Sequence, residues 1–142
     1  MSFFFFFVYR RCNFMPMAKD VETFLAAYPP EVRDVALAAR RLLGGALPGA
    51  TETLDDSARI IGYSYQPGYK GVVCTLILSR TGAKLGIVRG SEIPDPKRLM
   101  GGSGKVHRHV QLRSIADLKR PGLKPLLKAT LAAWRERNKV NG

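Results

Sequence analysis

The sequence predicts a single α+β domain in which an antiparallel β-sheet of about five strands is packed by N-terminal and C-terminal helices. Apolar residues recur at three- and four-residue spacing at residues 32–43 and 123–134, a pattern typical of amphipathic helices. Between these segments, short apolar runs rich in β-branched residues are separated by Gly and Pro turns, which is typical of strands joined by hairpins. The 142 residues are enough for one domain.

Two helices are predicted near the N-terminus. We expect Asp20 to cap a short first helix that ends at Tyr28-Pro29, because the residue before a proline avoids helical geometry. Pro30 then fits the first turn of a second helix, where its missing N–H costs little. We expect Gly44-Gly45 and Pro48-Gly49 to end that helix.

The middle of the chain is predicted to form the sheet. The expected strands are residues 51–54, 59–65, 72–78, 84–88 and 105–113. Short turns join the first four runs, so we expect antiparallel neighbours. After a short helical turn at residues 115–118, Pro121 is expected to open the last helix, whose apolar stripe ends at Trp134.

Composition excludes several classes of protein. An apolar fraction of 46% argues against wholesale disorder, and no apolar run reaches the roughly 18–20 residues of a membrane span. Cys12 and Cys74 cannot build a disulfide framework, which favours a reducing, cytoplasmic location. Cys74 lies in the most apolar strand and is expected to be an inert core thiol.

The first sixteen residues differ from the rest, because five consecutive phenylalanines at residues 3–7 precede Arg10 and Arg11. Three interpretations remain: a membrane-surface anchor, an added strand, or an extension upstream of a start at Met15 or Met17. We favour the extension, which gives an N-terminal extension at residues 1–16 and a single domain at residues 17–142.

Several short phrases carry a family resemblance. They are Phe24-Leu25-Ala26, Pro29-Pro30-Glu31, Gly62-Tyr63, Lys84-Leu85-Gly86-Ile87, Pro94-Asp95-Pro96, Gly102-Ser103-Gly104-Lys105, Arg108-His109-Val110 and Asp117-Leu118. Together they resemble the YdhG-like domain, a bacterial family of unknown function, over residues 17 to about 137. The resemblance implies a small α+β protein with a frataxin-like sheet. Many relatives carry a Gly-Met-Pro phrase after the first strand, where this chain has Ser-Ala-Arg-Ile-Ile-Gly at residues 57–62.

A few relatives are regarded as frataxin-like iron carriers, so metal binding is one alternative function. Frataxins hold hard cations on acidic helix faces. The acids of the first two helices here are offset by neighbouring cations; the acids are Asp20, Glu22, Glu31 and Asp34, and the cations are Lys19, Arg33, Arg40 and Arg41. Because surplus positive charge repels iron, we do not carry the iron role over.

The glycine-rich segment at residues 101–105 is a candidate anion-binding loop. It is not a P-loop, because Val106 follows Lys105 where a Ser or Thr is required, and a strand rather than a helix is expected next. Strand alternation places Lys105, His107, His109, Gln111 and Arg113 on one face, beside the loop. The predicted anion site therefore comprises Ser103, Gly104, Lys105, His107, His109 and Arg113. A flexible hairpin connection and a solvated sheet face are the alternatives.

Two neighbouring features have structural explanations. Arg108 is a cation in an apolar row, so we expect a structural ion pair with Glu52, Asp55 or Asp56. His107 and His109 point the same way on a strand, but Lys105 and Arg113 beside them oppose cation binding, so no metal site is predicted.

The functional prediction is a non-enzymatic module that binds an anionic small molecule or an acidic partner. We find no catalytic constellation, and we predict no cofactor. The net charge is +12, and residues 105–142 contain ten Lys or Arg against two acids. Weak nucleic-acid binding is therefore a further alternative, with Tyr63, Tyr65 and Tyr69 available for stacking.

Overall fold

The computed structural model describes residues 15–139, with side chains from residue 21 onward. The helices are α2 (Met15–Ala26), α3 (Pro30–Ala46) and α4 (Leu123–Lys139), with short 3-10 helices η1 (Tyr69–Gly71), η2 (Gly90–Glu92) and η3 (Ile115–Lys119). The strands are β1 (Thr51–Asp55), β2 (Ile60–Ser64), β3 (Val72–Ser79), β4 (Gly82–Ile87), β5 (Met100–Gly101) and β6 (Arg108–Leu112). No helix within residues 15–139 is long and apolar enough to cross a membrane.

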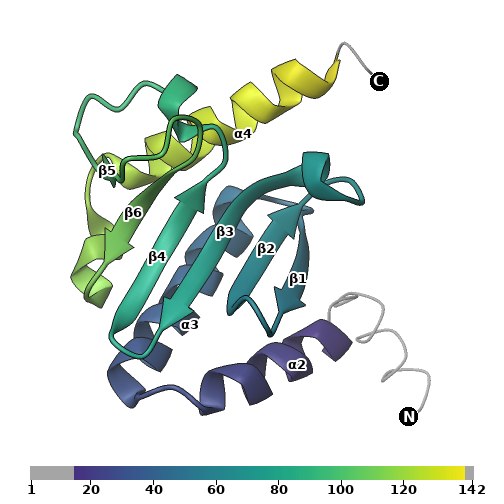
Figure 1. Ribbon diagram of the computed structural model, residues 1–142, viewed down its shortest axis with the longest axis vertical. Helices are drawn as coiled ribbons and strands as arrows, with labels where there is room; N and C mark the ends of the chain where they lie inside the picture. The colour runs from purple at the N-terminus through teal and green to yellow at the C-terminus, as the bar shows by residue number, and fades with distance from the viewer. Residues whose placement is uncertain (1–14, 140–142) are drawn as a thin grey trace.

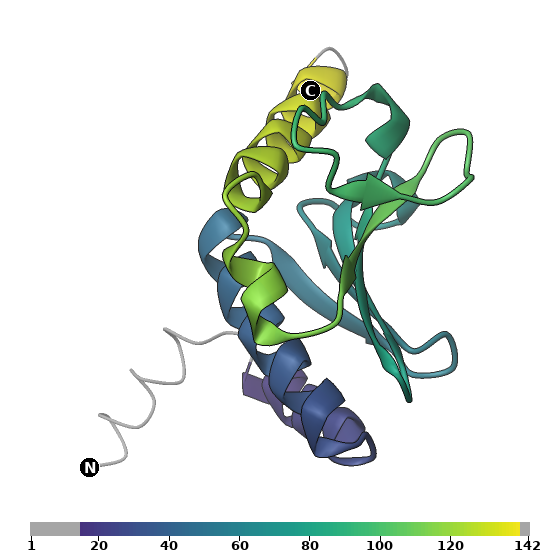
Figure 2. The same cartoon turned by 90° about the vertical axis from the view of Figure 1, so that its left-hand side faces the viewer.

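The strands form one antiparallel sheet in the order β1-β2-β3-β4-β6-β5 (Figure 1). The helices lie on one side of this sheet (Figure 2). The predicted α+β class with N-terminal and C-terminal helices is confirmed. The sixth strand is β5, a two-residue segment in the long connection between β4 and β6.

The core lies between the sheet and the helices. Leu43 of α3 and Leu127 of α4 are fully buried against Leu76 and Leu85 of the two central strands. Burying such a side chain contributes about 1.5–3 kcal/mol, so the two helical stripes hold the layers together. Cys74 also belongs to this core, and burial raises the pKa of its thiol to about 12.

Apart from the cross-strand pair Ile60 and Ile77, the central strands carry small and polar side chains on the opposite face of the sheet. One row of cross-strand neighbours runs Thr53, Gly62, Thr75, Gly86 and His109. The row is tightly spaced at Gly86, where a Cβ would lie 2.2 Å from Thr75 Oγ1.

Several predicted boundaries are wrong. Asp20 lies inside α2, which begins at Met15, so Asp20 does not cap the helix. Gly44 and Gly45 lie within α3, which runs on to Ala46. Pro121 precedes α4 by two residues. Most of the predicted extension at residues 1–16 lies outside the described residues.

The two glycines inside α3 provide a test of this helix. Neither would bring a Cβ within 4 Å of another atom. Gly45→Ala is therefore expected to raise the free energy of unfolding by about 0.5–1 kcal/mol in urea, because alanine loses less backbone entropy in a helix. Gly49→Ala is the control: its φ of +80° favours glycine, so this substitution should destabilise the protein. Equal effects of the two substitutions would contradict the assignment of Gly45 to α3.

Candidate functional site

The predicted anion loop connects β5 to β6. Ser103, Gly104 and Lys105 are exposed in it. Glycine is required at two positions: Gly102 has a φ of +105°, and a Cβ at Gly104 would lie 2.6 Å from the His107 carbonyl oxygen. The hairpin interpretation therefore explains these glycines without a ligand.

The predicted basic strand face is shorter than expected. Strand β6 begins at Arg108, so among the residues of that face only His109 and Gln111 alternate on the strand. The preceding backbone leaves the ladder because the Val106 carbonyl accepts a hydrogen bond from Ser91 N–H at 3.0 Å. Lys105 and His107 are consequently outside the strand.

The other predicted site residues lie apart. The His109 ring lies over the β5 backbone, with Cε1 3.0 Å from the position of a Cβ on Gly102. Arg113 follows the far end of β6, where its N–H donates to Asp117 Oδ2 at 2.6 Å. This bond is the main reason that the pKa of the Asp117 carboxyl is lowered. Arg113 and the glycine loop thus lie at opposite ends of one strand.

The structure corrects the expected ion pair of Arg108. Its Nη1 donates to the Gly102 carbonyl oxygen at 3.0 Å, and its Nε is buried without a hydrogen-bond partner. Within the described ranges, no carboxylate forms a salt bridge with Arg108. Glu52 is occupied by a nearer cation, and Asp55 Oδ1 accepts from its own turn at Ser57.

That nearer cation is Arg40, in a buried polar network on the helix side of the sheet. Arg40 Nε and Nη2 donate to the two oxygens of Glu52, each at 2.8 Å. The Tyr63 hydroxyl donates to Glu52 Oε2 at 2.7 Å. Burial and the Glu52 charge raise the pKa of Tyr63, and the bond to Glu52 raises the pKa of Arg40. Each member has a partner, so the network is structural.

His107 occupies a different environment from the other predicted residues. Arg89 N–H donates to His107 Nδ1 at 3.0 Å, and His107 Nε2 lies 3.1 Å from the Tyr69 hydroxyl. Because Nδ1 accepts a hydrogen bond, the ring proton belongs on Nε2, which donates to the Tyr69 oxygen. His107 is thus fixed between η1 and the segment after β4.

A pocket of about 480 Å³ opens beside His107. Its lining comes from η1, the strand ends, the loop and α4: Tyr69, Lys70, Val72, Val88, Arg89, Val106, His107, Arg137 and Asn138. The α4 wall is held in place because Trp134 Nε1 donates to the Lys70 carbonyl oxygen at 2.8 Å. Segments that are distant in the sequence, from residue 69 to residue 138, therefore meet at this pocket.

The pocket contains more positive than negative charge. Arg137 is partly buried, and desolvation together with the positive charge of Arg89 lowers its pKa. Glu92 lies outside the lining, but its negative charge acts on Arg137 and opposes the lowering of the Arg137 pKa. The Glu92 carboxylate is engaged by Arg89, with Nε donating to Oε1 at 3.1 Å. That bond lowers the pKa of Glu92. In the part of the chain that the structure describes, no carboxylate pairs with Arg137.

Sequence reasoning missed Arg89 and Arg137 because they lie in segments with no shared motif. The backbone conformation of Arg89 distinguishes it from other surface arginines, although nothing in the sequence does. Three non-glycine residues between positions 15 and 139 have positive φ, and all three are arginines: Arg59, Arg89 and Arg98. Left-handed backbone costs an L-residue roughly 1–2 kcal/mol, which glycine avoids. Two of these arginines line pockets.

No group of three or more potential metal-ligating side chains occurs among the described residues. His107 and His109 do not point to a common position, because one contacts Tyr69 and the other lies over Gly102. No family model matches this chain, and neither does any curated protein or solved structure.

Proposed function

We propose that this protein is a non-enzymatic binding module for a small anion, which binds in the pocket beside His107. The carrying observation is Arg137, a partly buried guanidinium that faces the charge of Arg89 and has no carboxylate partner within the described ranges. Because Glu92 already engages the Arg89 guanidinium, a bound anion would chiefly give Arg137 a charge-assisted partner and relieve the remaining repulsion between the two cations. Lys70 adds a third positive charge at the edge of the pocket.

The proposal moves the predicted anion site from the strand face into this pocket and keeps His107. Tyr69 is 77% exposed, and its ring stands edge-on to His107 with centroids 6.4 Å apart. Its hydroxyl already accepts from His107, so its own proton is free for an anionic oxygen. An oxyanion such as phosphate matches the donors of Tyr69, Lys70 and Arg137.

The test is a titration with inorganic pyrophosphate at low salt, followed through backbone amide signals. Saturable shifts are expected at residues 69–70, 89, 107 and 137. Arg89→Gly and Arg137→Gln should each weaken binding at least about tenfold, because a hydrogen bond to a charged group is worth about 1.5–3 kcal/mol. Arg89→Gly retains the backbone N–H that His107 requires.

Arg98→Gly is the matched control. Arg98 has a φ of 53°, close to the 55° of Arg89, and it lines none of the pockets described here. Both substitutions remove one charge and relieve the same backbone conformation. Equal weakening by Arg89→Gly and Arg98→Gly would show that binding depends only on net charge, and it would refute the pocket as the binding site. Shifts confined to residues 103–105, 109 and 113 would instead support the loop and strand face as the site.

A further inference from the structure

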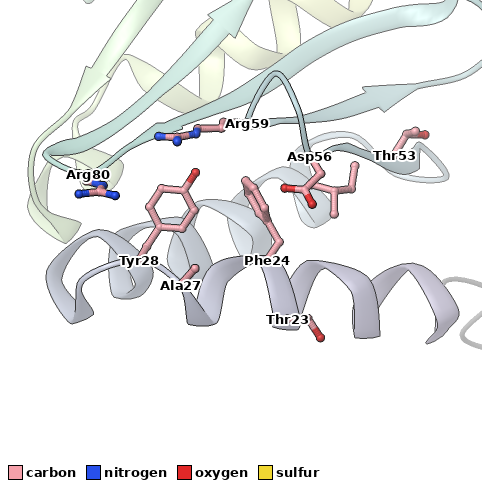
Figure 3. A pocket seen from close by; sticks show the side chains of 9 residues that line it. Thr23, Phe24, Ala27, Tyr28, Thr53, Asp56, Arg59 and Arg80 are labelled. Atoms are coloured by element: carbon pink, nitrogen blue, oxygen red, sulfur yellow. The ribbon is translucent and has the colours of Figure 1, made fainter.

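A second pocket, of about 610 Å³, lies at the other end of the sheet. This open pocket is lined by α2 and the two residues that follow it, by β1, by the turn between β1 and β2, and by the turn between β3 and β4 (Figure 3). The pocket beside His107 lies instead where β3 begins and β4 ends. The two pockets share no lining residue, so an inference about one does not depend on the other.

One wall of this second pocket is aromatic. Phe24 lies on α2 and Tyr28 lies two residues beyond its end, and their rings meet edge to face with centroids 5.2 Å apart. Ala27 and Leu54 extend the apolar surface. Figure 3 shows both rings pointing towards the strand turns, Phe24 from α2 and Tyr28 from the segment after it. This wall fits the flat or apolar body of a ligand.

Two guanidinium groups lie beside that wall. Arg59 and Arg80 come from different turns, and Figure 3 shows both on the Tyr28 side of the pocket. Neither forms a salt bridge with a carboxylate of the described residues. Burial raises the pKa of Tyr28, and the charge of Arg59 opposes this rise.

Arg59 is held at this position by both hairpins. Its carbonyl oxygen accepts from Leu78 N–H at 3.0 Å, and its N–H donates to the Asp56 carbonyl oxygen at 3.2 Å. Its φ is 59°, a conformation in which glycine would be more stable. The chain therefore has an arginine at this pocket although the backbone conformation there favours glycine.

The pocket also contains one acid. Figure 3 shows Asp56 on the opposite side of Phe24 from the two arginines. Its charge acts on Tyr28 in the direction opposite to that of Arg59. Arg59, Arg80 and Asp56 together carry a net charge of +1. One carboxylate balances this charge, whereas a doubly charged phosphate would leave a negative charge in excess.

We propose that this pocket binds a small amphipathic carboxylate, with its apolar or aromatic body against Phe24 and Tyr28 and its carboxylate between Arg59 and Arg80. The planar guanidinium fork matches a carboxylate in a bidentate geometry. The apolar body supplies the part of the binding energy that a free small anion lacks. The site is separate from the proposed anion pocket and takes a different class of ligand.

The experiment uses 3-phenylpropionate as the probe, with binding to the full chain followed by calorimetry and by the aromatic proton signals of Phe24 and Tyr28. Saturable binding is expected for 3-phenylpropionate. At least tenfold weaker binding is expected for 3-phenylpropanol, which lacks the charge, and for acetate, which lacks the ring. Acetate binding as tightly as 3-phenylpropionate would overturn the proposal.

Arg59→Gly and Arg98→Gly again form a matched pair, because both arginines have left-handed backbone and lose the same charge. Arg59→Gly should weaken 3-phenylpropionate binding at least tenfold, whereas Arg98→Gly should leave it within twofold. Equal weakening, or no saturable binding by the unmodified chain, would overturn the proposal. N-acetylglycylphenylalanine carries the same carboxylate beside an aromatic ring. Tighter binding of this peptide would support the site and identify a chain terminus as the source of the carboxylate.

Discussion

Replacing Glu52 by alanine is expected to lower the free energy of unfolding by about 3 kcal/mol, because it leaves a buried cation without its partner. Glu52 is 8% exposed, and the side chain of Arg40 is 20% exposed. Both of the guanidinium donors that face Glu52 would lose their acceptor at once. The Tyr63 hydroxyl would lose its acceptor as well.

Tyr63→Phe is the control for this prediction, measured by urea unfolding in parallel. It removes one hydrogen bond to the same carboxylate and leaves the ion pair in place, so a loss of about 1 kcal/mol is expected. The double variant should lose less than the sum of the two single losses, because both act on one network. If Glu52→Ala cost no more than Tyr63→Phe, the bond between Arg40 and Glu52 would not stabilise the fold.

Gly71→Ala is expected to destabilise the protein by about 3 kcal/mol, at the upper end of the usual cost of overpacking. A Cβ at Gly71 would lie 1.9 Å from the Gln66 carbonyl oxygen and 2.5 Å from the Gln66 carbonyl carbon. These are backbone atoms, so no side-chain rotation relieves the clash. The turn would have to open, although Tyr65 N–H donates to the Gly71 carbonyl oxygen at 3.0 Å across it.

Gly62→Ala is the matched substitution. Gly62 lies in β2, outside the positive-φ set, and its Cβ would meet only the Thr53 carbonyl oxygen at 3.9 Å. Alanine there should change the free energy of unfolding by less than about 1 kcal/mol. A similar small effect at Gly71 would show that the turn at residues 66–71 relaxes freely. Trp134 fluorescence gives a second readout, because the indole N–H donates to the neighbouring Lys70 carbonyl oxygen.

The sequence predicted the elements that depend on local periodicity. Pro30 begins α3 as expected, and the runs that start near Thr51, Ile60, Val72 and Lys84 are strands, because apolar spacing and turn residues determine both. The predicted start of β6 was wrong because a tertiary contact shortens the strand at its N-terminal end. Val106 pairs with Ser91 rather than with the sheet, and no pattern within residues 105–113 reveals that bond.

The pockets were beyond sequence reasoning for a related reason. Arg89 and Arg137 are 48 positions apart, and only the packing of α4 against η1 brings both to the pocket that His107 lines. The partner of Arg108 was predicted wrongly because alternation shows which face a cation occupies but not which acid reaches it. Arg40 lies on α3, where the charge pattern alone marks it as a surface residue.

Strand β1, which carries Glu52, lies at the outer edge of the sheet. An edge strand offers unpaired backbone groups to which another polypeptide can add. Here the strand has only five residues, and its inward-pointing Glu52 carboxylate is already paired with Arg40. The opposite edge has just two residues. The shortness of both edge strands therefore protects the sheet against intermolecular strand addition and aggregation.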